Sequence, residues 1–113
     1  MGDLAGALAP ALEAPAHLPV GSASWFRAAG ELIYASAPLG KHAEVVGWAD
    51  RVEATDPRDA AAAAARVAAL CRALIQLELI GRHPRALALL EVANRAAAAL
   101  GTAEPMVEAR LHQ

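Results

Sequence analysis

The sequence predicts an all-α protein built from five to six helices that pair as antiparallel hairpins. Three observations lead to this fold class. Alanine supplies most of the 57% apolar fraction, while Phe, Trp and Tyr together make up only 4% of the 113 residues, and alanine loses almost no side-chain entropy in a helix. The larger apolar residues recur at helical spacings of three and four. Proline and glycine separate these periodic segments from one another.

Residues 1–23 are predicted to form a short helix and a connector, set apart from a repeat domain over residues 24–113. Leu4, Leu8 and Leu12 lie four residues apart, which places them on one face of a helix that Pro10 must bend or interrupt. Residues 15–22 carry two prolines and a glycine and favour a connector. The opening helix is expected to complete an earlier unit of the array.

Two helices are predicted to follow. Ser24 is the expected N-cap of a helix that runs to about Ala37 and ends at Pro38 and Gly40. A third helix is expected over about residues 41–54. The apolar faces are Phe26, Ala29, Leu32 and Ile33 in the first of these helices and Val45, Trp48, Ala49 and Val52 in the second.

A long fourth helix is expected from Pro57 to Ile80. Asp56 is the predicted N-cap, Pro57 the first helical residue, and Asp59 a favourable negative charge in the first turn. Gly81 is expected to end the helix in a left-handed conformation. The predicted core stripe is Val67, Leu70, Cys71, Leu74 and Leu77, which Ile75 and Leu79 widen to one side.

The fifth helix is predicted from about Pro84 to Gly101, and a sixth segment begins at Pro105. The inner face of the fifth helix is expected to be Leu87, Leu90, Ala93, Ala97 and Leu100. The apolar positions of the sixth segment are Met106, Val107 and Leu111, and this segment looks cut short at Gln113.

A repeated element links the third and fifth helices. Gly40-Lys41-His42 recurs further along the chain as Gly81-Arg82-His83. Two histidines in equivalent places suggest either a catalytic or metal-binding pair or a repeated turn. The turn is favoured, because equivalent positions of packed helices are separated by roughly 8 to 10 Å, too far for two imidazoles to share one zinc ion.

These marks resemble the tetratricopeptide repeat, a helix-turn-helix unit of about 34 residues. Gly40 and Asp56-Pro57 match its turn glycine and the start of its next unit. Gly81, Ala86 and Ala93 match its glycine and two small positions, and Leu70, Ala73 and Leu77 match apolar positions of its first helix. Val45, Val52 and Leu74 depart from the pattern, and the interval from Gly40 to Gly81 is longer than one such unit. Such long, alanine-rich repeats resemble the arrays attached to large bacterial signalling proteins, including serine/threonine kinases and ATPase-type regulators.

The resemblance implies a short α-solenoid that binds a peptide or helix of a partner protein on its concave face, which the first helix of each hairpin lines. The candidate contact residues are polar positions of the second and fourth helices: Arg27, Glu31, Arg72, Gln76 and Glu78. One alternative is a structural or dimerising fragment of a larger signalling protein, with a homodimer formed through the exposed terminal segment. Another is a helical bundle that encloses a small molecule near Trp25, Trp48 and Leu77.

Composition argues against other classes of function. A net charge of -2 and scattered basic residues do not favour nucleic acid. The longest apolar run, residues 60–65, predicts no membrane span, and the lack of a cationic leader with a lone Cys71 indicates a cytoplasmic protein. No catalytic, nucleotide-binding or metal-binding motif is present in the sequence, so no enzyme, cofactor or metal is expected. Cys71 is predicted to be an inert core thiol, and the aromatic residues are predicted to be core, with Trp25 partly exposed.

Overall fold

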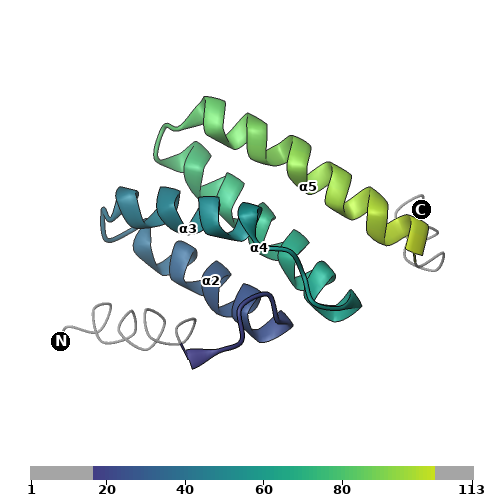
Figure 1. Cartoon of the computed structure of the whole chain (residues 1–113). Helices are drawn as coiled ribbons and strands as arrows, with labels where there is room; N and C mark the ends of the chain where they lie inside the picture. The colour runs from purple at the N-terminus through teal and green to yellow at the C-terminus, as the bar shows by residue number, and fades with distance from the viewer. Residues whose placement is uncertain (1–16, 104–113) are drawn as a thin grey trace.

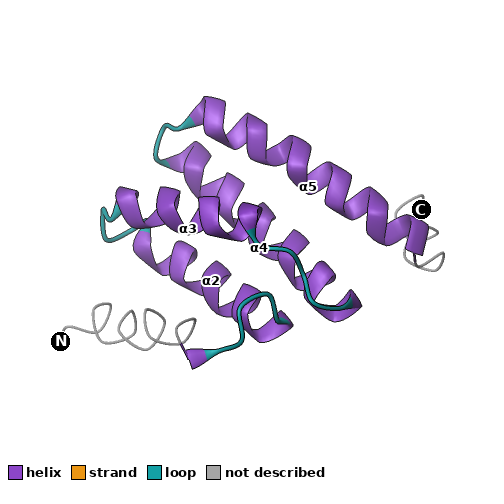
Figure 2. Ribbon diagram, viewed as in Figure 1, coloured by secondary structure: helices purple, strands orange, loops and turns teal. Residues whose placement is uncertain are grey.

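The computed structural model describes residues 17–103, which form four α-helices and no strand (Figures 1 and 2). The helices are α2 (Ala23–Ser36), α3 (His42–Ala54), α4 (Ala60–Leu79) and α5 (His83–Ala103). The all-α prediction is confirmed. The predicted helix over residues 3–14 and the sixth segment from Pro105 lie outside the described residues, so four of the five to six expected helices are seen.

The four helices form two antiparallel hairpins, α2 with α3 and α4 with α5. Helix α4 occupies the middle of the described structure, because it packs against α2, α3 and α5. Figure 1 shows α2 and α4 side by side and both hairpin turns at the same end of the molecule. The second hairpin therefore packs on the first through α4, which contacts both α2 and α3.

The two hairpin turns have the same geometry, as the repeated Gly-basic-His element predicts. Gly40 and Gly81 both have positive φ, of 75° and 84°. In the first turn the N–H of Lys41 donates to the carbonyl of Ser36 over 3.1 Å. In the second, the N–H of Arg82 donates to the carbonyl of Leu77 over 2.8 Å. Each bond spans the same number of residues and closes the helix with a left-handed glycine.

Helix α2 begins earlier than predicted. Its N-cap is Ser22, whose hydroxyl accepts a hydrogen bond from the Trp25 N–H over 3.1 Å, and not Ser24. Trp25 and Phe26 lie in the first turn, and both are fully buried. The prediction that Trp25 is partly exposed is therefore wrong.

Helix α4 begins later than predicted, and its N-cap is Asp59 in place of Asp56. The Asp59 carboxylate accepts a hydrogen bond from the Ala62 N–H over 2.8 Å. The residues before it are held elsewhere, since the Arg58 N–H donates to the carbonyl of Gly21 over 3.0 Å. A contact with the start of α2 thus replaces the helical turn that the Asp56-Pro57 pair favours locally.

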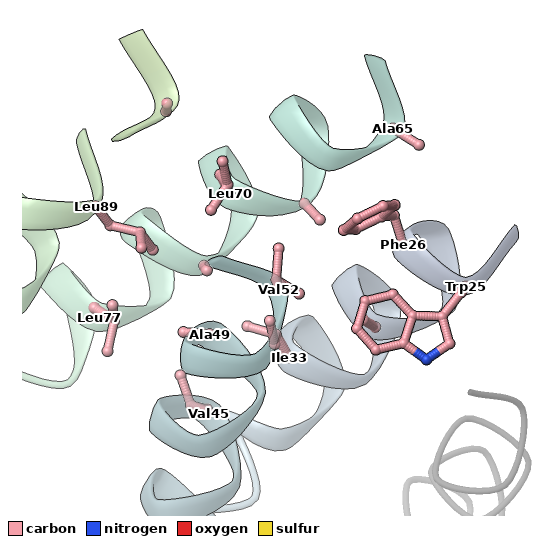
Figure 3. Close-up of a cluster of buried hydrophobic side chains, with 14 of the residues drawn as sticks. Trp25, Phe26, Ile33, Val45, Ala49, Val52, Ala65, Leu70, Leu77 and Leu89 are labelled. Atoms are coloured by element: carbon pink, nitrogen blue, oxygen red, sulfur yellow. The ribbon is translucent and has the colours of Figure 1, made fainter. Parts of the chain in front are cut away.

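The core lies between the hairpins and is built largely from small side chains (Figure 3). Its larger members come from all four helices. They include Phe26 and Ile33 of α2, Val45 and Val52 of α3, Leu70 and Leu77 of α4, and Leu89 of α5. Alanines fill the space between them, notably Ala29, Ala49, Ala62, Ala69, Ala73, Ala86 and Ala93.

The buried faces of α4 and α5 differ from the predicted stripes. Cys71 is exposed, so the prediction of a buried core thiol is wrong. Leu87 and Leu90 are exposed as well, whereas Ala86, Leu89 and Ala93 are buried. The face is set by the neighbouring helices, which approach most closely along the alanines, and the bulkier residues beside them are left outside.

The predicted end of α5 at Gly101 is also wrong. The helix continues through Gly101 to Ala103, and the glycines with positive φ among the described residues are Gly21, Gly40 and Gly81. Gly101 is buried within the helix. A glycine can stand inside a helix at a cost of about 1 kcal/mol relative to alanine, and therefore it does not always end one.

Polar contacts join the two hairpins at their edges. Arg66 of α4 donates to the carbonyl of Glu53 over 2.8 Å and so satisfies a carbonyl at the C-terminal end of α3. Arg85 of α5 pairs with Asp50 over 2.7 Å and with Glu53. Partial burial opposes the charged form of Arg85, but the hydrogen bonds and attraction from the two carboxylates outweigh it and raise the pKa of Arg85.

Helix α4 is long and apolar enough to cross a membrane by length and composition alone, contrary to the sequence expectation. The central helix of a water-soluble protein meets the same criterion. Here α4 packs against three other helices of the same chain. The packing is consistent with a soluble protein.

Candidate functional site

A groove runs along the joint between α2 and α4, and we call it the α2–α4 groove. It consists of three hollows of about 200, 460 and 690 Å³ that share lining residues. Arg72 lines the first and second hollows, and Tyr34 and Gln76 line the second and third. The hollows therefore follow one another along the two helices, from Phe26 toward the hairpin turns.

Small residues form the floor of the groove at its first hollow. Gly30 of α2 lies against α4, and a Cβ atom placed on it would stand 3.6 Å from the Ala69 Cα and 3.4 Å from the Arg72 Cδ. Ala65 and Ala68 line the same hollow. Since these residues carry little bulk, the two helix backbones approach closely and longer side chains form the rim.

Charged side chains make up the rim of the first hollow. Arg27 and Glu31 are exposed on α2, and Arg72 faces them from α4. Within residues 17–103, no hydrogen bond or ion pair engages the side chain of Arg27 or Glu31. The groove thus carries exposed cationic and anionic side chains together at this place.

An aromatic and aliphatic surface follows in the second and third hollows. Tyr34 is 60% exposed and its ring lies under the Arg72 guanidinium, with 5.6 Å between the guanidinium carbon and the ring centroid. Ile75 lines the second hollow, and Leu79 lines the third. These two side chains are 52% and 74% exposed. Large apolar side chains gathered in a hollow are typical of interaction sites.

The third hollow lies beside the two hairpin turns. His42, at the start of α3, and Gly81, in the second turn, both line it. His83 has a different environment, because its Nδ1 atom pairs with the Glu78 carboxylate over 2.8 Å at the surface. The two histidines therefore have different roles. His42 borders the groove, and His83 links the start of α5 to Glu78 near the end of α4.

The structure brings four of the five predicted contact residues to the groove. Arg27, Glu31, Arg72 and Gln76 all line its hollows. Gln76 is only 7% exposed, however, so it belongs mainly to the packed interface between helices. Glu78 is engaged by His83 at the turn, away from the other four, because it lies on a different side of α4.

The predicted contact residues do not include Tyr34 or the exposed pair Ile75 and Leu79. The prediction places Tyr34 in the core with the other aromatic residues, yet Trp25 and Phe26 are the buried ones and Trp48 is half-buried. Trp25 and Trp48 instead contact Arg51, whose guanidinium carbon lies 4.2 Å from the Trp48 ring centroid. The four-residue spacing of Ile75 and Leu79 predicts an apolar strip on α4. The spacing alone does not show whether another helix packs over this strip.

Residues 17–103 contain no group of three or more His, Cys, Asp or Glu side chains placed to hold a metal ion. No protein-family model matches the chain, and neither a curated protein nor a solved structure matches it.

Proposed function

We propose that the chain is a non-catalytic interaction module whose α2–α4 groove binds a segment of another protein. The observation that carries the proposal is the run of hollows along two helices. The exposed charges of Arg27 and Glu31 lie at one end, and the exposed Tyr34, Ile75 and Leu79 lie at the other. A groove of this length and openness suits an extended or helical peptide.

We also propose that the two hairpins are repeats of a short α-solenoid similar to the tetratricopeptide repeat. The identical turn bonds at Gly40 and Gly81 and the packing of α4 against both helices of the first hairpin support this arrangement. In such an array, the first helices of successive hairpins line the binding face, and the groove lies between the first helices α2 and α4.

The groove favours an amphipathic ligand. An apolar side chain of the ligand fits the surface formed by Tyr34, Ile75 and Leu79, and a charged flank meets Arg27 and Glu31. The rim carries both positive and negative charges. It therefore contributes mainly to specificity, by favouring ligands whose charges occur in the complementary order, and less to affinity.

A peptide-display selection against the full chain tests this proposal. We expect the selected peptides to share an apolar residue flanked by charge, and the best peptide is then titrated by fluorescence anisotropy. Tyr34→Ala and Arg27→Glu should each weaken binding by about tenfold, which corresponds to roughly 1.4 kcal/mol.

The matched control is Arg95→Glu, a charge reversal on the exposed surface of α5 outside the groove. It should leave peptide affinity and melting temperature unchanged. Failure to select any peptide, or equal loss of affinity in the groove and control variants, would contradict the proposal.

A second function, a structural or dimerising role, is favoured by the exposed Leu87 and Leu90 of α5. A reducing, cytoplasmic location within a larger bacterial signalling protein is proposed alongside both functions. The free, exposed Cys71 supports the reducing setting, since thiols stay reduced in the cytosol.

A further inference from the structure

The second hairpin presents an apolar surface that no described residue covers, and we call it the terminal face. On α4 it consists of exposed residues spaced three or four apart: Ala64, Ala68, Cys71, Ile75 and Leu79. On α5 it continues with Leu87 and Leu90, which are 62% and 41% exposed. Residues at this spacing share one side of a helix, so the surface follows much of the length of α4.

The first hairpin shows what normally covers such a face. Aligning the turn glycines Gly40 and Gly81 relates each position of α2 or α3 to its equivalent in α4 or α5. Gly30 thus corresponds to Cys71. Gly30 is buried against Ala69 and Arg72 of α4, whereas Cys71 is exposed.

The same difference occurs on the second helix of each hairpin. Ala49 of α3 is fully buried in the core, and its equivalent Leu90 is 41% exposed. Positions inside a hairpin do not differ in this way, since Val45 and its equivalent Ala86 are both buried. Cys71 and Leu90 are therefore the counterparts of positions that are buried in the first hairpin, on the side where a following helix would pack. Ala68 and Ile75 differ from them, because their counterparts Arg27 and Tyr34 are exposed in the first hairpin as well.

The size of the face is close to that of a stable interface. Two packed helices of about 20 residues present a surface of roughly 30 by 20 Å, on the order of 600 Å². A standard interface buries about 800 Å² on each partner.

The chemistry of the face suits association with itself. None of its residues is charged, and the chain has a net charge of only -2, so bringing two copies together causes little repulsion. In a twofold dimer each copy contributes the same patch, and the apolar strips of α4 and α5 then bury each other.

We propose that the terminal face is a homodimer interface, with a second copy of the chain placed where a following helix would pack. Leu87 and Leu90 lie outside the lining of the α2–α4 groove, so variants at these two residues test the dimer without altering the groove. Ala68, Ile75 and Leu79 belong to both surfaces, so the dimer and a bound peptide would compete for this strip of α4. This dimer differs from one formed through the segment after Pro105, because the contacts come from α4 and α5.

Sedimentation equilibrium of the full chain over a wide concentration range is the first test. We expect a concentration-dependent dimer, and Leu87→Glu or Leu90→Glu should raise its dissociation constant at least about tenfold. Val20→Glu is the matched control, since Val20 is 52% exposed and lies before α2. It should leave the dissociation constant unchanged.

Cys71 provides a second readout without any substitution. As the single cysteine of the chain, it reports on the face through its rate of reaction with a thiol reagent. This rate should fall as the dimer forms, and it should stay constant with concentration in Leu87→Glu. Because Leu87 is mostly exposed, that variant is expected to keep its helical circular dichroism and melting temperature.

A chain that remains monomeric at all concentrations overturns the proposal. So does a dimer that Leu87→Glu and Leu90→Glu leave intact, or one in which Cys71 reacts as fast as in the monomer. Peptide binding by the groove is measured separately and would survive each of these outcomes.

Discussion

The guanidinium of Arg72 on α4 stacks over the ring of Tyr34 on α2, with 5.6 Å between the guanidinium carbon and the ring centroid. This contact joins the first helices of the two hairpins at the surface of the α2–α4 groove. Since Tyr34 is 60% exposed, solvent weakens the interaction, and its main role is to hold the two side chains in the groove.

Removing this contact should cost little stability. We expect Arg72→Ala and Tyr34→Ala each to lower the free energy of unfolding by at most about 1 kcal/mol, with a coupling energy of about 0.5 kcal/mol for an exposed cation–π pair. Urea denaturation of the single and double variants measures both quantities. A loss of several kcal/mol would show that Arg72 or Tyr34 is a structural residue and not a surface of the groove.

The N-cap of α4 can be identified by a pair of matched substitutions. Asp59→Ala removes the acceptor of the Ala62 N–H and should lower stability by about 1 kcal/mol. Asp56→Ala should have a much smaller effect, because its exposed carboxylate caps nothing in α4. Thermal unfolding followed by circular dichroism compares the two, and equal losses would argue against Asp59 as the cap.

Arg66 should stabilise the joint between α3 and α4. Its hydrogen bonds to the carbonyls of Glu53, over 2.8 Å, and Val52, over 3.4 Å, are lost in Arg66→Met, while the aliphatic part of the side chain is retained. We expect a loss of about 1 to 2 kcal/mol, typical of hydrogen bonds made by a charged donor. Arg95→Met, at an exposed arginine that pairs with Glu91 on the surface of α5, should be close to neutral in the same denaturation experiment.

Two glycines with positive φ should respond differently to alanine. At Gly81 the added Cβ meets no atom within 4 Å, so Gly81→Ala should cost only the conformational strain of about 1 to 2 kcal/mol. At Gly21 the same Cβ would lie 2.7 Å from the carbonyl oxygen of Asp56. Gly21→Ala should therefore lower the melting temperature further than Gly81→Ala, and the reverse order would contradict the contact between residue 21 and the segment before α4.

The hairpin turns and the number of central helices could be predicted because their signals are local. Gly40 and Gly81 each stand after an apolar helical stretch and before a basic residue and a histidine. A left-handed glycine at such a place ends a helix whatever surrounds it. The equivalence of the two turns follows from sequence alone for this reason.

The faces of α4 could not be predicted in the same way. One side of the helix carries Val67, Cys71 and Leu74, and another carries alanines such as Ala65 and Ala69. Hydrophobicity favours the first side, but Gly30 on α2 permits a closer approach to the second. Which side becomes buried depends on a neighbour distant in sequence, and the same is true of Asp59, which caps α4 because Arg58 is bonded to Gly21.

The groove residues could be predicted where exposure follows from the side of the helix on which a residue lies. They could not be predicted where the burial of a side chain depends on how the two hairpins pack. Arg27 and Glu31 lie on the same side of α2 as Gly30, one turn apart. Gln76 lines the groove from α4 together with Tyr34, yet it is only 7% exposed. Such burial arises only when the two hairpins pack together, so the sequence of one helix does not reveal it.

The position of α4 also determines how the molecule comes apart. Because α2, α3 and α5 all pack against this one helix, any opening that releases α4 separates the two hairpins and breaks the second one, which leaves the first hairpin only the packing of α2 against α3. Backbone amides in the middle of α4 should therefore exchange with deuterium last, through global unfolding only. Cutting the chain in the linker between Ala54 and Ala60 should yield two fragments that regain helix only when they are mixed.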